Sequence, residues 1–155
     1  MTAPETRGWK LFAHPAFSGT LNELVAEATR LRAADPEGYT QHPKLKLLKR
    51  IVDLIEIEIP RDPGATEYLL GNTLGPEHRH WRRAKFLGRF RLFFRYSSID
   101  RVIIYAWVND ENMLRKVGGR NDPYAIFSSR LRRGEPPDDW DALIKEAVQL
   151  TQQNE

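Results

Sequence analysis

The residues best suited to chemistry lie between His78 and Ser98, a stretch of basic, aromatic and aliphatic residues that contains no acid. It reads HRHWRRAKFLGRFRLFFRYSS. Its cations are Arg79, Arg82, Arg83, Lys85, Arg89, Arg91 and Arg95. Cations gathered without neighbouring acids repel one another, and a polyanion relieves that repulsion. The stretch therefore indicates a nucleic acid, RNA or DNA, as the first partner to consider.

Basic side chains of this kind can promote RNA cleavage without a metal ion. The 2′-hydroxyl attacks the adjacent phosphorus, and negative charge grows on the non-bridging oxygens. Arginine and lysine fixed around that phosphate stabilise the transition state more than the ground state. A lysine among other cations can act as a base or an acid, and a tyrosine can transfer a proton or stack on a base. The alternative that these arginines have no function stays open, because arginines on the exposed face of a sheet are commonly only solvated.

Other chemistries find little support in the sequence. His78 and His80 are two residues apart, but no carboxylate or third histidine is placed closely enough to suggest a metal site, so we expect no metal ion. His14 and His42 each precede a proline and are typical of turns. No glycine-rich phosphate loop precedes a helix, so we also expect no cofactor.

The alternation of residue types predicts how the cations are presented. Strands are expected at residues 81–87, 89–96 and 101–109, joined by turns at Gly88 and at residues 97–100 into an antiparallel meander. One face of this sheet carries Phe86, Phe90, Leu92 and Phe94. The other face carries Arg83, Lys85, Arg91 and Arg95. We expect the apolar face to pack on helices and the basic face to stay exposed.

A helical hairpin is expected to cover the apolar face. Residues 20–34 repeat apolar positions at spacings of three and four, and Thr20 and Glu23 have the spacing of a capping box. A second helix opens at Pro43, in the first turn where proline is tolerated, and Pro60 stops it.

The remaining segments complete the predicted order of elements. Residues 9–13 are expected to form a first strand, with an N-terminal arm as the alternative. Residues 60–80 are rich in proline and glycine and predict a long crossing loop. A third helix is expected over residues 122–134, with Tyr124 in its first turn, and a last, acidic helix over residues 138–150.

Composition restricts the class of protein. The chain has 155 residues, 41% of them hydrophobic, and a net charge of +3, which fits one domain with a core of modest size. The absence of cysteine excludes disulfides and thiolate metal sites. No run of apolar residues is long enough to span a membrane, and the N-terminus lacks the apolar segment of a signal peptide. We expect a cytoplasmic protein with no membrane partner.

Four long motifs of the chain resemble the YhaV family of toxins. They are GWKLFAHP, WRRAKFLGRFRLFFRY, VIIYAWVNDENMLR and DPYAIFSSRLRRGEPPDDW. The resemblance covers residues 8–140, with residues 138–155 as a C-terminal helix and tail, and we expect residues 1–155 to form a single toxin domain.

The resemblance implies both a fold and an activity. The family belongs to the RelE-like superfamily, so the expected fold is α+β, with a small antiparallel sheet, a helical hairpin on one face and C-terminal helices. The expected function is that of the toxin of a type II toxin–antitoxin system. It would be a metal-independent mRNA endoribonuclease that inhibits translation and growth, often acting with the ribosome. A PrlF-type antitoxin would neutralise it, and the toxin–antitoxin complex would bind operator DNA.

The resemblance also implies site residues. Its basic pair on the strand after the hairpin falls on Arg83 and Lys85, its later strand arginine on Arg91, and its tyrosine near the start of the core helix on Tyr124. As a working hypothesis, Lys85 is general base or acid, Arg91 holds the scissile phosphate, Arg83 stabilises developing charge, and Tyr124 orients the 2′-hydroxyl or stacks on a base. The flanking residues expected to bind RNA are His80, Arg89, Arg95, Arg115 and Arg120. For the arginine in the loop before the core helix, Arg120 is the first candidate and Arg115 the second.

Two other functions remain open at this point. The chain could be a module of the same fold that grips RNA or the ribosome without cutting. It could also be an interaction protein whose basic face holds an acidic antitoxin segment. In either case the acidic C-terminal helix could fold over the basic face and mask it.

Overall fold

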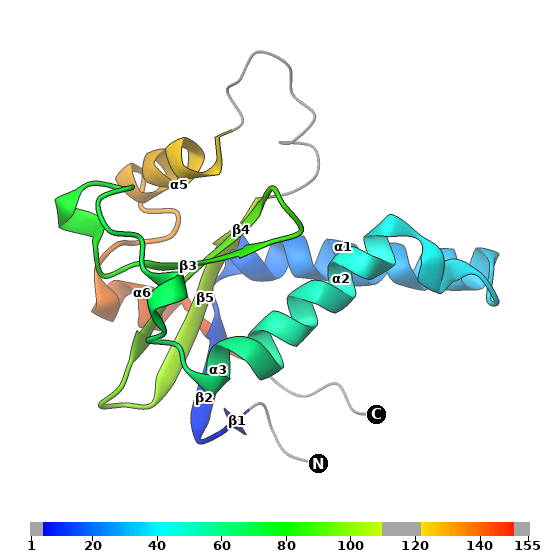
Figure 1. Ribbon diagram of the computed structural model, residues 1–155, viewed down its shortest axis with the longest axis horizontal. Helices are drawn as coiled ribbons and strands as arrows, with labels where there is room; N and C mark the ends of the chain where they lie inside the picture. The colour runs from blue at the N-terminus through cyan, green and yellow to red at the C-terminus, as the bar shows by residue number, and fades with distance from the viewer. Residues whose placement is uncertain (1–4, 110–121, 151–155) are drawn as a thin grey trace.

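The computed structural model of the chain describes residues 5–109 and 122–150. A sheet lies between two groups of helices, α1 to α3 on one side and α5 and α6 on the other (Figure 1). Its strands lie in the order β1-β2-β5-β4-β3, and β6 also pairs with β2. The strands are β1 Glu5–Thr6, β2 Trp9–Ala13, β3 Arg82–Phe86, β4 Phe90–Ser97, β5 Val102–Val108 and β6 Val148–Gln149. The main helices are α1 Pro15–Ala34, α2 Pro43–Asp53, α3 Ile59–Arg61, α5 Pro123–Arg132 and α6 Trp140–Glu146.

The predicted meander is confirmed, but the sheet as a whole is mixed. Strands β3, β4 and β5 pair antiparallel, and Leu87 and Gly88 in the tight turn between β3 and β4 have φ of 46° and 79°. Three residues, Leu87 to Arg89, separate the paired Phe86 and Phe90, and positive φ values are common in such short hairpin loops. Strand β2 runs parallel to β5, so the expectation of an antiparallel sheet is wrong. Parallel neighbours need a long crossover, and here α1, α2 and the β3–β4 hairpin supply it.

Helix α1 begins five residues before the predicted start. Pro15 occupies its first turn, and the Nδ1 atom of His14 accepts a hydrogen bond from the backbone N–H of Ala16 at 3.0 Å. The capping box predicted at Thr20 and Glu23 is therefore wrong, because both residues lie inside the helix. His14 reads as a turn residue in the sequence, yet it is the helix cap.

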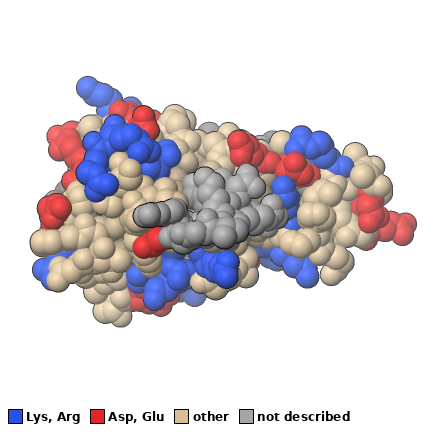
Figure 2. All heavy atoms as spheres, turned by 90° about the horizontal axis from the view of Figure 1, so that it is seen from above, with Lys and Arg blue, Asp and Glu red and all other residues tan. Residues whose placement is uncertain are grey.

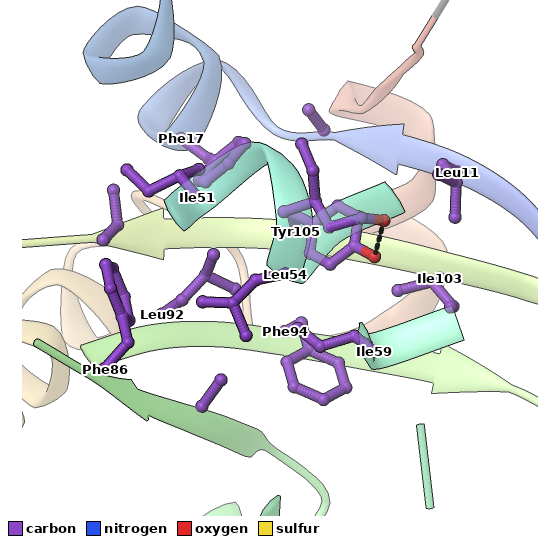
Figure 3. Packing of buried hydrophobic residues seen from close by; sticks show 14 of the residues in the cluster. Leu11, Phe17, Ile51, Leu54, Ile59, Phe86, Leu92, Phe94, Ile103 and Tyr105 are labelled. Carbon is purple, nitrogen blue, oxygen red and sulfur yellow. Dashed lines mark hydrogen bonds between the residues drawn. The ribbon is translucent and has the colours of Figure 1, made fainter. Parts of the chain in front are cut away.

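Helix α2 begins at Pro43 as predicted, and the helical path runs past the predicted stop. It continues through a π-helical turn, η2 (Leu54–Glu58), and ends with α3. In that π pattern the carbonyl of Ile55 would accept from residue 60, which is proline and has no N–H. The hydroxyl of Tyr105 donates to this carbonyl instead, at 2.7 Å (Figure 3). The bond from the sheet explains how Pro60 is accommodated within the helical path.

The face of the sheet toward α1, α2, η2 and α3 is called the helix face here. Its core includes Phe17, Ile51, Leu54, Phe86, Leu92, Phe94 and Tyr105 (Figure 3). This packing confirms the predicted burial of the β3–β4 apolar face. Helices α1 and α2 run side by side and extend away from the sheet (Figure 1). No helix within residues 5–109 and 122–150 combines the length and the apolar character needed to cross a bilayer.

The opposite face, called the site face, carries a second core. It is formed by Trp81, Phe93, Trp107, Phe127, Leu131 and Leu143. Helices α5 and α6 supply part of it, so the expectation of a fully exposed basic face is wrong. Phe93 and Phe94, neighbours on β4, enter the two different cores because successive side chains of a strand point to opposite faces. The cations must therefore lie around an aromatic core and not on an open sheet.

The C-terminal segment departs most from its prediction. Helix α6 ends at Glu146, and the chain then pairs with β2 as strand β6. Its cap is Asp139, one residue after the predicted start of the helix, and the Asp139 carboxylate accepts from the N–H of Ala142 at 3.0 Å. The predicted helix over residues 138–150 is thus too long at both ends. The sequence pattern of this segment does not reveal that β2 has an edge free to pair.

Candidate functional site

Helix α5 brings Tyr124 onto the basic strands. Asp122 caps this helix by accepting a hydrogen bond from the N–H of Tyr124 at 3.0 Å, and Pro123 occupies its first turn. The ring of Tyr124 packs edge-on against Phe93 of β4, with centroids 5.8 Å apart. The predicted start of the third helix is confirmed, and the start places the phenol beside Arg83 and Arg91.

Arg83, Tyr124 and Arg91 form one hydrogen-bonded group, called the Arg–Tyr–Arg cluster here. The phenol oxygen accepts a hydrogen bond from a terminal nitrogen of Arg83 at 3.0 Å and one from Nε of Arg91 at 3.1 Å. The guanidinium of Arg83 also lies 5.8 Å from the centre of the phenol ring. A phenol oxygen has two lone pairs and one hydrogen. Because both lone pairs face arginines, the hydroxyl hydrogen is available to donate to a ligand.

Backbone carbonyls hold the two arginines in place. Arg83 donates to the carbonyl of Leu69, in the loop before β3, at 3.2 Å, and is 9% exposed. Its Nε is buried and has no hydrogen-bond partner among the described residues. Arg91 donates to the carbonyls of Gly88 and Phe90 at 2.9 and 2.8 Å. The cluster is therefore fixed before any ligand binds, as electrostatic catalysis requires.

Asn109 supports the site and is absent from the sequence prediction. It is 1% exposed, and its side-chain oxygen accepts from the backbone N–H of Arg91 at 2.8 Å. Its amide nitrogen donates to the carbonyl of Arg89 at 3.2 Å. One side chain thus binds the backbone on both sides of Phe90. An isolated asparagine that directly follows the apolar strand VIIYAWV was the available signal.

Lys85 lies next to the cluster. In the β3–β4 register it is directly opposite Arg91, so their side chains project from the same face of the sheet. Lys85 is exposed, whereas Arg91 is half-buried. Over residues 5–109 and 122–150, no carboxylate oxygen lies within 4.0 Å of a charged nitrogen of Lys85, Arg83 or Arg91. These cations are therefore not neutralised by described acids.

The residues predicted to flank the site have different surroundings. Arg89 is exposed in the β3–β4 turn. Arg95 lies near the rings of Trp81 and Trp140, at 5.7 and 5.3 Å from their centres, and donates to the backbone carbonyl of Asp138 at 2.7 Å. Burial lowers the pKa of Arg95, and the nearby Asp138 partly offsets this. Arg115 and Arg120 lie outside the described residues. Binding of RNA by His80, Arg89, Arg95, Arg115 and Arg120 stays a prediction.

A second polar cluster lies where the loop before β3 meets the segment before α6. Oδ1 of Asp138 is 3.0 Å from Nδ1 of His78, 2.9 Å from Nε2 of His80 and 2.7 Å from Nε1 of Trp81. The expectation that no carboxylate lies close enough to the two histidines to suggest a metal site is therefore wrong, because the fold brings in an acid 58 residues from His80. We call His78, His80 and Asp138 the His–His–Asp cluster.

The charges in this second cluster influence one another. Partial burial lowers the pKa of His80, the charge of Arg95 lowers it further, and Asp138 opposes both. Burial acts to raise the pKa of Asp138, but hydrogen bonds from Trp81 and His80 outweigh it, so the net shift is downward. The Asp138 carboxylate therefore stays charged over the whole neutral range and is ready to meet a cation or an N–H donor.

The charged surface is uneven. Figure 2 looks from above, onto the side of the molecule where α5 and the β3–β4 turn lie in Figure 1. Lys and Arg side chains form several separate groups on this side, with Asp and Glu between some of them. The net charge of +3 is thus distributed as local clusters, which favours a defined site over general attraction to polyanions.

The fold and the Arg–Tyr–Arg cluster define an α+β protein with a cationic site suited to a phosphodiester. Comparison with known families makes this specific. The chain belongs to the YhaV toxin family, whose model matches residues 11–148 and is described as a toxin with endonuclease activity, of a toxin–antitoxin system. The family confirms the resemblance found in the sequence and the prediction that the chain is an enzyme that cleaves nucleic acid.

Similar proteins bear names that agree with the family. The chain is 45% identical over 141 residues to the ribonuclease toxin YhaV of Escherichia coli strain K12, covering 90% of this chain and 92% of the relative. The toxin YhaV of Escherichia coli O157:H7 matches with the same identity and coverage. No solved structure gives a significant match. The helices and the mixed sheet of the structure confirm the α+β class, and the assignment to the RelE-like fold stays a prediction.

Proposed function

We propose that this toxin is an mRNA endoribonuclease that uses the Arg–Tyr–Arg cluster and Lys85 and needs no metal ion for catalysis. The observation that carries the proposal is the Tyr124 hydroxyl, held by Arg83 and Arg91 at 3.0 and 3.1 Å, with exposed Lys85 opposite Arg91. The ribonuclease toxin of Escherichia coli strain K12, 45% identical, supports RNA as the substrate.

The reaction consistent with this geometry is transfer of the phosphoryl group to the neighbouring 2′-hydroxyl. The 2′-oxygen forms a bond to phosphorus, and its proton passes to a base. The bond between phosphorus and the 5′-oxygen breaks, and the 5′-oxygen receives a proton from an acid. The products are a 2′,3′-cyclic phosphate and a free 5′-hydroxyl, so no water or metal ion takes part in this step.

Each side chain then has a defined task. Arg91 holds the scissile phosphate, and Arg83 stabilises the charge that develops on its non-bridging oxygens. Tyr124 points its remaining hydrogen at the substrate and orients the 2′-hydroxyl, with stacking on a base as its alternative task. Lys85, exposed and beside the other cations, transfers a proton as base or acid.

In the cell, cleavage of mRNA would stop translation and growth. We propose that cleavage occurs on the ribosome, in the cytoplasm, and that a PrlF-type antitoxin neutralises the enzyme. The complex of toxin and antitoxin would bind operator DNA. Membership of a toxin–antitoxin family supports an antitoxin partner, and the cations without described acidic partners would suit an acidic segment of that partner.

The test is inducible expression of the wild-type chain followed by mapping of RNA 5′ ends with and without translation. The site variant is the double substitution Lys85→Ala/Arg91→Ala. The control is the double substitution Arg32→Ala/Lys46→Ala, which removes two exposed cations from α1 and α2. We expect the site variant to lose cleavage and growth inhibition by at least about 10²-fold, since one stabilising donor contributes about 10²–10³ in rate. The helix variant should behave as wild type.

The outcomes separate the candidate functions. New ends with 2′,3′-cyclic phosphates, present only in translated messages, support a ribosome-dependent ribonuclease. Ends that also appear without translation would retain the nuclease and remove the ribosome from the proposal. Growth arrest without new ends would instead indicate a module that binds RNA or the ribosome without cutting. A fully toxic Lys85→Ala/Arg91→Ala variant would refute the site assignment.

A further inference from the structure

The His–His–Asp cluster has the residue types and the spacing of a transition-metal site. The ligand-type atoms of His78, His80 and Asp138 all lie within 4.8 Å of one another. Both nitrogens, Nδ1 of His78 and Nε2 of His80, face the same carboxylate oxygen at 3.0 and 2.9 Å. Around a tetrahedral ion with bonds of about 2.0–2.2 Å, neighbouring ligand atoms are about 3.4 Å apart. A separation of a few tenths of an ångström would therefore admit an ion.

We infer that this cluster binds one Zn²⁺ ion per chain, through Nδ1 of His78, Nε2 of His80 and a carboxylate oxygen of Asp138. Imidazole nitrogen with one carboxylate suits zinc and its neighbours in the transition series, whereas magnesium and calcium prefer oxygen alone. The chain has no cysteine, so a thiolate site is excluded. Three protein ligands leave a fourth position for water.

Surrounding groups already orient the ligands. The indole N–H of Trp81 donates to Oδ1 of Asp138 at 2.7 Å, which fixes the carboxylate and leaves it further lone pairs for an ion. The other nitrogen of His78, Nε2, lies 3.9 Å from Oε2 of Glu77, too far for a hydrogen bond in this structure but close enough for a small movement to form one. A carboxylate behind a metal-binding imidazole is a common supporting arrangement. Arg95 opposes a cation here, but its hydrogen bond goes to the backbone carbonyl of Asp138.

The ion would act as a brace for the site face. It would join the loop before β3 to the segment before α6, whose ligands are 58 and 60 residues apart in sequence. Trp81, held by Asp138, packs on Phe127 of α5 with centroids 5.0 Å apart. Phe127 stacks on Phe93 at 4.2 Å, and Phe93 contacts Tyr124. A continuous aromatic path therefore connects the metal site to the Arg–Tyr–Arg cluster without placing the ion in the reaction.

The test uses the full-length chain without an affinity tag, stripped of metal by a chelator. Zn²⁺ is titrated by calorimetry, Co²⁺ by its visible absorption, and thermal unfolding is followed with and without Zn²⁺. We expect one ion per chain, a tetrahedral Co²⁺ spectrum and a midpoint raised by roughly 5–10 °C at a hundredfold excess over the dissociation constant.

Two variants and two controls make the test specific. His80→Ala removes an exposed ligand, and Asp138→Asn keeps an oxygen acceptor for Trp81, so both should fold and lose the Zn²⁺ shift and the Co²⁺ spectrum. His42→Asn, at the α2 cap, and Asp141→Asn, exposed on α6, should bind as wild type.

Absence of the Co²⁺ spectrum and of the Zn²⁺ shift in the wild type would overturn the inference, as would an unchanged shift in His80→Ala. The inference does not depend on the proposed cleavage. Metal binding without RNA cleavage would leave this site intact and refute the nuclease proposal. Cleavage in chelator by still-folded protein is the expected result, because the ion takes no part in the chemistry.

Discussion

The two faces of the sheet are built on different principles. On the helix face, Ile51, Leu54 and Phe94 are almost fully buried, and the Tyr105 hydroxyl is satisfied by the carbonyl of Ile55. On the site face, a buried guanidinium nitrogen of Arg83 has no described partner. Apolar burial stabilises a fold, whereas a buried cation with incomplete hydrogen bonding opposes it. Both faces bury an apolar core, but on the site face the held cations offset part of the stability that its aromatic core contributes.

Phe94→Ala should produce the largest effect, which is a loss of stability. Phe94 is fully buried between Tyr68 and Tyr105, with ring centroids 5.5 and 6.2 Å away. Removing the ring leaves a cavity, so we expect the free energy of unfolding to fall by about 3–5 kcal/mol. Urea unfolding measures this change, and Ile99→Ser is the control because Ile99 is 92% exposed. A loss below 1 kcal/mol would mean that the helix face is not the stabilising face.

Arg83→Met should show the reverse pattern on the site face. Methionine keeps the length and apolar contacts of the side chain but removes the buried charge and its hydrogen bond to Tyr124. We expect RNA cleavage to fall by about 10²–10³-fold and the free energy of unfolding to change by less than about 1 kcal/mol. Single-turnover cleavage and urea unfolding of the same preparation give both quantities. A destabilisation as large as that of Phe94→Ala would make Arg83 a structural residue.

Two tyrosines offer a matched comparison, because each hydroxyl serves a different face. Tyr105→Phe removes the donor to the Ile55 carbonyl, so we expect about 1–2 kcal/mol less stability and unchanged cleavage per folded molecule. Tyr124→Phe keeps the ring on Phe93 but removes the acceptor between Arg83 and Arg91, so we expect roughly 10–100-fold slower cleavage and near-native stability. Equal effects of both variants on activity would contradict the division between the faces.

Local patterns were enough to predict much of this arrangement. Alternation along residues 81–87 and 89–96 predicted the β3–β4 hairpin and the sheet's contribution to the helix-face core, and Asp122-Pro123 predicted the start of α5. The structure then brings together Arg83, Arg91 and Tyr124, the residues that family resemblance selected. In these places neighbouring residues determine the conformation, so a single sequence contains the necessary information.

Features that depend on distant segments could not be predicted. The parallel pairing of β2 with β5 and the pairing of β6 with β2 depend on which edges remain free after folding. Asp138 reaches His80 from 58 residues away, and the sequence near the histidines carries no sign of it. The cover of α5 and α6 over the site face could not be predicted for the same reason: Phe93 shares the basic face of its strand with Arg91 and Arg95, and only the distant helices bury it.

The smallest expected effect concerns a charge at the rim of the helix face. Partial burial in η2 raises the pKa of Glu56, and the charge of Asp53 raises it further. A raised pKa in the folded state means that the contribution of Glu56 to stability is complete below its unfolded pKa of 4.5 and is lost as the pH rises through the folded value. Glu56→Gln should therefore stabilise the protein at pH 7, by less than about 1 kcal/mol because solvent screens this side chain.

The gain from Glu56→Gln should disappear below about pH 4, where the carboxyl is protonated in both the folded and the unfolded chain. Urea unfolding at pH 7 and below pH 4 measures this gain in stability. The control is Glu23→Gln, at an exposed position of α1. A gain of equal size at both pH values would indicate altered packing or helix propensity, and a loss at pH 7 would contradict the sign. The expected result would show that the helix face tolerates a misplaced charge only at its rim, where water reduces the cost, whereas Arg83 is held at a buried position.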